Sequence, residues 1–273
     1  MLRLRTVVAV LAVVAVASLL WVGLGSQTVY ASDGPIRVRD PFASRPVGPF
    51  SLLTNPAAVV EEKALGVHLG FQPGDHDGPI RFLGYSDPGG GLFAAGAFVW
   101  LEGGKATGSK WRQLSYHIGR FLTGHVAVGA AVKHIASPEG QRWAGDLGLY
   151  APFQENWIAA LVYYNAFGGT DLDPEELVAS ISYISREGWG FSVEMGTPLS
   201  SSDMSPIVAW VLDLPVGANA MLRAGHRRYL DSDASAEWLG ALRWDFGSFL
   251  LDAGVVWPQE GVAVYRIGVT LPF

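Results

Sequence analysis

The sequence predicts an all-β fold, a closed antiparallel β-barrel that crosses a membrane with its strands. Three observations support this class. Short segments of alternating polar and apolar residues follow one another from about Lys63 to the C-terminus. The turns between them alternate between a tight kind and a longer, more acidic kind, which is typical of the two rims of a transmembrane barrel. The last segment ends in Phe273, and every second residue before it is apolar: Tyr265, Ile267, Val269 and Leu271.

The composition fits a chain that is partly solvated by lipid. Of the 273 residues, 49% are apolar and only 16% are charged, whereas soluble domains carry about 25% charged residues. The 12% of aromatic residues excludes a disordered chain. The formal charge of −6 argues against a nucleic-acid partner. Because there is no Cys, disulfides, Cys-ligated zinc and thiol nucleophiles are excluded.

Residues 1–31 are predicted to be a secretory signal peptide. Arg3 and Arg5 precede the apolar run from Val7 to Val22, and the segment that ends at Ala31 fits a cleavage site. A retained membrane anchor is the alternative, but the run is shorter than the ~20 residues of a spanning helix. Since no later apolar run reaches that length, the exported chain is expected to span the membrane with strands.

Residues 32–62 are predicted to form a hatch ahead of the barrel. This stretch does not alternate, and its prolines exclude a further strand in the sheet. Asn55 as N-cap and Pro56 at the first helical position start a short helix, with Ala57 behind them. We expect the hatch to lie inside the barrel or across its periplasmic mouth and to obstruct the lumen.

Residues 63–273 are predicted to form the barrel. About fifteen residues are available for each strand and its turn, and a strand needs roughly 9–11 to cross the bilayer. Twelve strands remain possible because the second and thirteenth segments are short, but closure is required in either case, since an open edge would leave backbone groups unpaired in hydrocarbon. The expected fourteen segments are 63–72, 79–87, 91–102, 110–119, 124–135, 142–151, 157–166, 177–185, 189–196, 205–213, 218–229, 236–245, 249–257 and 262–273.

The alternation assigns side chains to lipid or lumen. Arg or Lys facing lipid at mid-depth costs about 2–4 kcal/mol, so polar residues within the segments are placed in the lumen. The lumen-lining candidates are Ser115, His117, His125, Lys133, Asp146, Glu194, Arg223, Arg227 and Arg266. Tryptophans near segment ends are expected in the interfacial girdles: Trp100, Trp111, Trp143, Trp157, Trp189, Trp244 and Trp257.

The lumen candidates leave alternatives open. The charged ones either pair with one another in a packed barrel, which is favoured, or select a solute. Ser115, His117 and His125 suggest hydrolase chemistry, but there is no Gly-x-Ser-x-Gly motif, and lumen lining is favoured. We therefore predict no catalytic residues and no cofactor.

Acidic loops provide the remaining candidate ligands. Asp75-His76-Asp77 offers carboxylate and imidazole groups, and a second acidic loop contains Asp171, Asp173, Glu175 and Glu176. A cation needs more ligands than one tripeptide supplies. Both loops are therefore interpreted as solvated, and no metal site is predicted.

Several short motifs resemble a known family. Asn55-Pro56-Ala57 resembles the hatch motif of FadL-type transporters and of the related PorV/PorQ-like outer-membrane proteins. The resemblance covers most of residues 53–273 and implies a fourteen-stranded barrel with an N-terminal plug. One departure is the Pro-rich stretch 40–49, which replaces the Gly/Ala-rich stretch usual before the hatch motif. The strand motifs similar to the PorV-like branch are 129–133, 146–150, 164–168, 222–229 and 265–269.

The predicted function is that of a barrel in the bacterial cell outer membrane that admits or transports small solutes, hydrophobic ones included. The alternative is a plugged barrel that acts as a docking or secretion-accessory protein, as the PorV-like resemblance implies. An outer-membrane enzyme is a third, disfavoured class because no catalytic motif is present. The expected partners are outer-membrane lipid and the insertion machinery, which would read the terminal Phe273.

Overall fold

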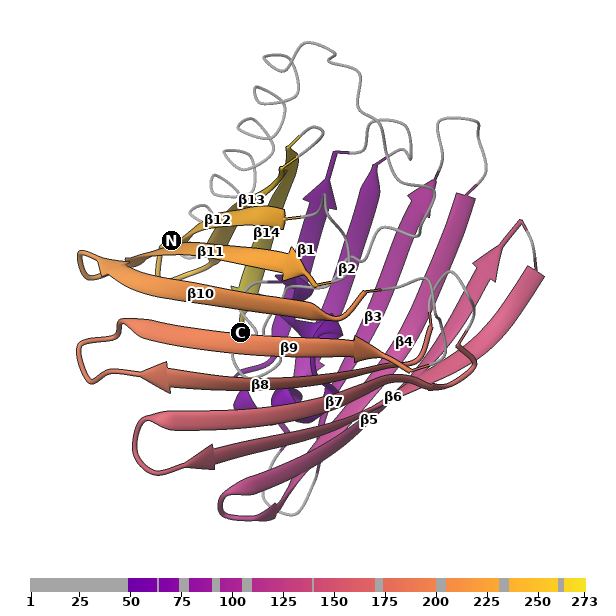
Figure 1. The fold of residues 1–273 in the computed structure, drawn as a ribbon, viewed down its shortest axis with the longest axis horizontal. Coiled ribbons are helices and arrows are strands. Elements are labelled where there is room, and N and C mark those ends of the chain that lie inside the picture. The colour runs from indigo at the N-terminus through magenta and orange to yellow at the C-terminus, as the bar shows by residue number, and fades with distance from the viewer. Residues whose placement is uncertain are drawn as a thin grey trace.

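A computed structural model describes residues 49–62, 64–73, 79–89, 94–104, 110–138, 140–169, 174–199, 205–230, 236–259 and 263–273. The predicted signal peptide and the first part of the hatch, residues 32–48, lie outside these ranges. Fourteen antiparallel strands close into one barrel, in which the last strand lies beside the first (Figure 1). The fourteen-stranded barrel is confirmed, and the twelve-stranded alternative is wrong.

Each predicted segment corresponds to one strand, and the ends differ by at most four residues. The strands are β1 (Gly66–Gln72), β2 (Ile80–Asp87), β3 (Ala95–Gly104), β4 (Lys110–Thr123), β5 (Val126–Ser137), β6 (Gly140–Phe153), β7 (Trp157–Phe167), β8 (Glu176–Ile184), β9 (Gly190–Pro198), β10 (Ile207–Val216), β11 (Ala220–Tyr229), β12 (Ala236–Asp245), β13 (Leu250–Pro258) and β14 (Val264–Pro272).

The barrel closes between β1 and β14. Their register runs from Gly66 opposite Pro272 to Phe71 opposite Ile267. The N–H of Phe273 extends the seam by donating to the backbone oxygen of Leu65 at 2.9 Å. Every strand thus has a hydrogen-bonded neighbour on both sides, which satisfies the backbone groups that would otherwise face hydrocarbon.

The two faces of the wall follow the alternation of the sequence. On β9, Phe191 and Met195 are exposed on the outer surface, whereas Ser192 between them is buried. On β4, Tyr116 is exposed and His117 beside it is buried. The outer surface is therefore an apolar belt, and the polar residues of the strands point inward.

Aromatic side chains mark both ends of this belt. On the rim with the tight turns, Phe153, Trp157, Tyr183 and Trp189 contact one another in series, with ring centroids 6.4, 5.1 and 5.2 Å apart. On strands β10–β12 toward the opposite rim, the ring of His226 lies 4.7 Å from that of Trp238. Such rows are typical of interfacial girdles.

Trp111 is an exception to the predicted girdle. It shares the inward parity of Ser115 and His117 on β4, and it packs against the buried cluster that includes Val99 and Leu101. Its ring lies over Gly103, where an added Cβ would come within 2.5 Å. The prediction that Trp111 belongs to the girdle is therefore wrong, because position near a strand end does not determine the face.

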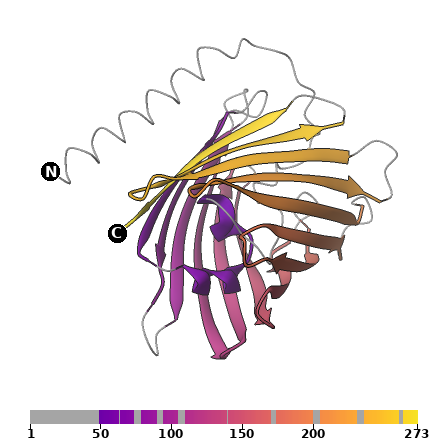
Figure 2. The ribbon, with the colours of Figure 1, turned by 90° about the vertical axis from the view of Figure 1, so that its left-hand side faces the viewer.

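The described part of the hatch lies within the ring of strands (Figure 2). It consists of two short 3-10 helices, η1 (Pro49–Leu53) and η2 (Pro56–Glu61). η1 contacts β1, β2, β3 and β14, and η2 contacts β3, β4, β5 and β6. Neither helix has the length or the apolar run needed to cross a membrane.

Candidate functional site

The Asn-Pro-Ala motif both starts η2 and attaches it to the wall. The side-chain oxygen Oδ1 of Asn55 accepts the N–H of Ala57 at 2.9 Å, which is the N-cap interaction predicted from the sequence. The Nδ2 of the same side chain donates to the backbone oxygen of Leu149 on β6 at 3.1 Å. Asn55 and Ala57 are buried, so the motif is one of the points at which the hatch is bonded to the barrel.

Three glycines form the surface on which η2 rests. Gly119, Gly129 and Gly148 lie directly opposite one another on β4, β5 and β6. A Cβ at Gly129 would come within 2.3 Å of the backbone nitrogen of Ala57, and one at Gly148 within 2.3 Å of Oδ1 of Asn55. The hatch therefore lies against bare backbone, and we call this row the glycine seat.

An apolar strip lies beside the glycine seat. Leu52, Leu53 and Val59 of the hatch pack into one buried cluster with the inner face of β2 and β3. The wall contributes Ile80, Phe82, Ala95, Ala97, Val99 and Leu101 to it. This part of the inner wall is apolar, and in the structure it is covered by the hatch.

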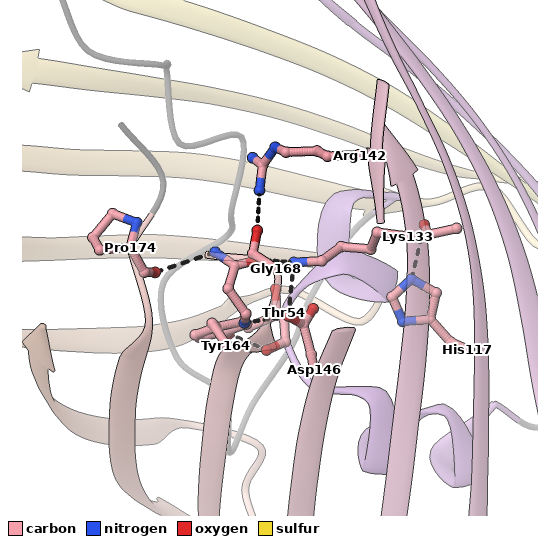
Figure 3. A network of polar contacts seen from close by, with 10 residues as sticks. Thr54, His117, Lys133, Arg142, Asp146, Tyr164, Gly168 and Pro174 are labelled. Carbon is pink, nitrogen blue, oxygen red and sulfur yellow. Dashed lines mark hydrogen bonds and ion pairs between the residues drawn. The ribbon is translucent and has the colours of Figure 1, made fainter. Parts of the chain in front are cut away.

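A buried polar network lies on β5, β6 and β7 near the hatch (Figure 3). The ammonium of Lys133 donates to Oδ1 of Asp146 at 2.7 Å and to Oδ1 of Asn165 at 2.6 Å. Asn165 in turn donates its backbone N–H to Oδ1 of Asp146 at 2.8 Å. All three residues are buried, and a buried charge is tolerated when it is paired and hydrogen-bonded in this way.

The network occupies an irregularity in the wall. Gly145 pairs with Phe167 and Leu147 with Tyr163, so β7 has two residues more than β6 between these pairs. Asn165 adopts a left-handed conformation there, with φ of 50°. Its N–H is satisfied by the carboxylate of Asp146. The neighbouring Tyr164 donates its hydroxyl to the backbone oxygen of Thr54 in the hatch. The irregular point of the wall is therefore bonded to the hatch.

Ion pairs cross the inner face of β10–β13. Each one joins residues directly opposite in the register. Arg223 binds Asp213 through two bonds, of 2.6 and 3.0 Å, and this pair is buried. Arg227 binds Glu237, and Arg243 binds Asp252, both at 2.9 Å. Next to this group, Arg266 on β14 donates to Gln72 of β1 at 2.7 Å.

The structure places most of the predicted lumen residues on the inner face. Lys133 and Asp146 are joined in one network, whereas Arg223, Arg227 and Arg266 each bind a different partner. Glu194 is half-buried on the inner face of β9. Sequence reasoning did not identify Asp213, Glu237, Gln72 and Asn165 as the partners, because cross-strand pairing depends on a register that the sequence does not state.

Two predicted positions need correction. His125 is exposed in the tight turn between β4 and β5, because β4 continues to Thr123 and β5 begins at Val126. It therefore lies at the rim and not in the lumen. Glu176, expected in a solvated loop, is buried at the start of β8. Asp75, His76, Asp77, Asp171 and Asp173 lie outside the described residues.

The Ser115–His117 pair lacks the third group of a Ser-His triad. Nε2 of His117 lies 3.1 Å from Oγ of Ser115, but Nδ1 of the same ring has no hydrogen-bond partner. A Ser-His triad needs an acid or amide on that nitrogen to orient the ring. Within the described ranges, no group of three or more potential metal ligands comes together either.

Known proteins resemble this chain in fold and not in sequence. The sequence matches no protein-family model and no curated protein. The CymD monoaromatic hydrocarbon channel superposes with a TM-score of 0.65 at 14% identity, covering 85% of this chain and 94% of its own. The toluene transporter TbuX of Ralstonia pickettii gives 0.64 at 12% identity, covering 84% and 94%. The toluene transporter TodX of Pseudomonas putida gives 0.63 at 11% identity, covering 89% and 99%.

Proposed function

We propose that this protein is a bacterial outer-membrane barrel that admits small hydrophobic solutes, with the hatch as the movable part of the route. The observation that carries the proposal is the apolar strip of β2 and β3 beneath Leu52, Leu53 and Val59. If the hatch moves away, this strip offers a solute an apolar surface, and burial of apolar area is worth about 25 cal/mol per Å². The names of the three channels and transporters of similar fold support the same class of solute.

The buried polar groups on the inner face of β8–β11 favour a hydrophobic solute over a hydrophilic one. The hydroxyls of Ser182 and Ser192 are 0% exposed and hydrogen-bond each other at 2.6 Å. Asp213 is equally buried in its pair with Arg223. A water-filled pore needs polar groups that face water, and these groups are turned toward one another.

The proposal includes two partners that follow from the surface of the barrel. The apolar belt between aromatic rows fits the lipid of the outer membrane. The insertion machinery is proposed to read the last strand through Phe273, whose side chain is 69% exposed beyond the end of β14.

A reversible tether of the hatch tests the proposal. The chain has no Cys, so Ala57→Cys with Ala127→Cys introduces one pair within a single buried cluster of hatch and wall. We expect toluene uptake by proteoliposomes to fall when the pair is oxidised and to return on reduction. The single variant Ala127→Cys is the control and should be insensitive to oxidation. Full uptake through the oxidised double variant would rule out hatch movement.

A second candidate function is the docking or secretion-accessory role of the PorV/PorQ-like branch. It is favoured by the number of bonds between hatch and wall, among them those from Asn55 to Leu149 and from Tyr164 to Thr54. In a barrel whose hatch is fixed, the loops would be the surface that binds a partner protein. Under this alternative, toluene uptake should equal that of protein-free liposomes with the tether either oxidised or reduced.

A further inference from the structure

A chain of hydrogen bonds joins the end of the hatch to the seam of the barrel. The imidazole of His68 on β1 lies between two hydroxyls: Nδ1 is 3.1 Å from Oγ1 of Thr270 on β14, and Nε2 is 2.8 Å from Oγ of Ser86 on β2. The hydroxyl of Ser86 continues to Oε2 of Glu62 at 3.4 Å. Glu62 is the C-cap of η2, so this series of hydrogen bonds runs from β14 to the hatch.

The backbone beside this series of hydrogen bonds leaves space for its side chains. His68, Ser86 and Thr270 are all buried. A Cβ at Gly66 would come within 3.0 Å of Nε2 of His68 and 3.1 Å of Oγ of Ser86. Two residues from Ser86 along β2, a Cβ at Gly84 would come within 2.9 Å of Leu52 in the hatch. The seam thus makes room for the imidazole and for the hatch together.

The order of the groups excludes a hydrolytic triad. In a triad the acid binds the imidazole and the imidazole binds the serine. Here the carboxylate of Glu62 binds the serine, and a threonine occupies the other nitrogen of His68. The arrangement is suited to carrying a proton between hatch and seam and not to activating a nucleophile.

Every link in this chain can both donate and accept. With Glu62 ionised, Ser86 donates to it, His68 donates from Nε2 to Ser86, and Thr270 donates to Nδ1. With Glu62 protonated, each bond can reverse, and His68 then donates from Nδ1 to Thr270. Neither protonation state leaves the imidazole unsatisfied, so the site can take up a proton without breaking.

We propose that Glu62 is a proton-binding latch, which holds the hatch against the β14–β1–β2 seam when it is protonated and releases it more readily when it is ionised. Its hydrogen-bond partner is Ser86, which in turn binds His68, and Arg243 on β12 attracts the carboxylate electrostatically. The position of the hatch would follow the pH in this way whichever solute passes.

The sign of the pH dependence follows from burial. Desolvation in the docked hatch raises the pKa of Glu62 above its ordinary value, against smaller opposite effects of Ser86 and Arg243. In a released hatch the carboxyl would be in water and would titrate near its ordinary pKa. The docked state therefore keeps a proton at pH values where the released state has lost it. Docking strengthens as the pH falls and weakens as the pH rises through the raised pKa.

Pulsed EPR distances between two nitroxides test the latch without any solute. Glu61→Cys on the hatch and Gly124→Cys in a tight turn are both exposed positions, and nothing lies within 4 Å of a Cβ at Gly124. We expect the narrow docked distance to lose population as the pH rises above the ordinary pKa of a glutamate side chain. The ratio of docked to released hatch should change up to tenfold for each unit by which the two pKa values differ.

Two further variants test whether Glu62 is the residue that binds the proton. Glu62→Gln should stay docked with a flat pH profile, and Arg243→Gln should move the profile to higher pH by removing a positive charge. A flat profile in the wild type would overturn the proposal. So would a profile that persists in Glu62→Gln and disappears in His68→Gln, because it would assign the proton to the imidazole.

Discussion

Gly148 on β6 lies so close to Asn55 of the hatch that an added Cβ would come within 2.3 Å of the side-chain oxygen Oδ1. That oxygen accepts the N–H of Ala57 and so caps the start of η2. The amide nitrogen of the same side chain donates to the backbone oxygen of Leu149. One asparagine therefore sets the start of the hatch helix and its depth in the barrel, and the glycine permits both.

The glycine seat should be intolerant of even one methyl group. Gly129→Ala would place a Cβ within 2.3 Å of the backbone of Ala57, and inserting a methyl into a packed site typically costs about 1–3 kcal/mol. We expect faster hydrogen exchange across residues 55–61 and a lower urea midpoint. Gly124→Ala is the matched control, since its Cβ would meet open space; equal effects of the two variants would contradict the seat.

Lys133 is expected to be essential to the buried network. Lys133→Met leaves the carboxylate of Asp146 buried beside Asn165 without its cation, and breaking such a pair costs about 3–5 kcal/mol. The free energy of unfolding in lipid measures the loss. Adding Asp146→Asn should recover part of it. As a control, Arg186→Met removes an exposed pair with Glu155 and should change little.

Tyr164 is expected to hold the hatch to the irregular point of β7. Tyr164→Phe removes the hydroxyl that binds the backbone of Thr54, and a neutral hydrogen bond of this kind is worth about 0.5–1.5 kcal/mol. Hydrogen exchange of residues 49–62 should accelerate while exchange in β10–β13 stays constant. Tyr116→Phe, on the exposed outer face, should leave both regions unchanged. No difference between the two variants would mean that this bond does not hold the hatch.

The two faces of the wall should respond differently to a charge. Val193 has the outward parity of β9, and Val193→Arg should cost about 2–4 kcal/mol of stability in lipid. From the alternation alone, Ser192→Arg is expected to be tolerated better, but Ser192 is buried against Ser182, so this variant should also lose stability. Val256→Arg on the half-buried inner face of β13 is the better control. Equal folding yields would contradict the assigned faces.

The C-terminal residue should act in assembly in two separable ways. Deleting Phe273 removes its ring and also the N–H that binds Leu65, whereas Phe273→Ala removes the ring alone. If the insertion machinery reads the ring, both variants should lower the amount of heat-modifiable barrel in the outer membrane. A defect confined to the deletion would assign the effect to the seam hydrogen bond.

The strands and the hatch helix could be predicted because they depend on local patterns. Period-two alternation marks every strand, and Asn55-Pro56 marks the start of η2. Cross-strand relationships could not be predicted in the same way. The partners of Arg223 and Arg227 and the match of Gly129 with Gly148 all depend on register. A shift of the register by one residue moves every side chain of a strand to the opposite face. Loop length does not determine the register.

The irregularity of β7 at Asn165 could not be predicted from the sequence. Asn165 interrupts an apolar strand, which is a visible signal, but its partners Lys133 and Asp146 lie on two other strands. Only the folded barrel brings them together. The motif 164–168 resembles a strand motif of the PorV-like branch, and the bond from Tyr164 to Thr54 shows that it attaches the wall to the hatch.

The seat of the hatch has a consequence for the order of assembly. Residues 55–57 are synthesised early, but the wall that receives them includes Leu149, 94 residues beyond Asn55. Contacts between residues so far apart in the sequence form slowly. The hatch can therefore bind only after the strands that form its binding surface have folded. The bond between His68 and Thr270, 202 residues apart, cannot form until the last strand arrives. The hatch is therefore fixed in two stages, and the second stage is finished only when β14 has closed the barrel.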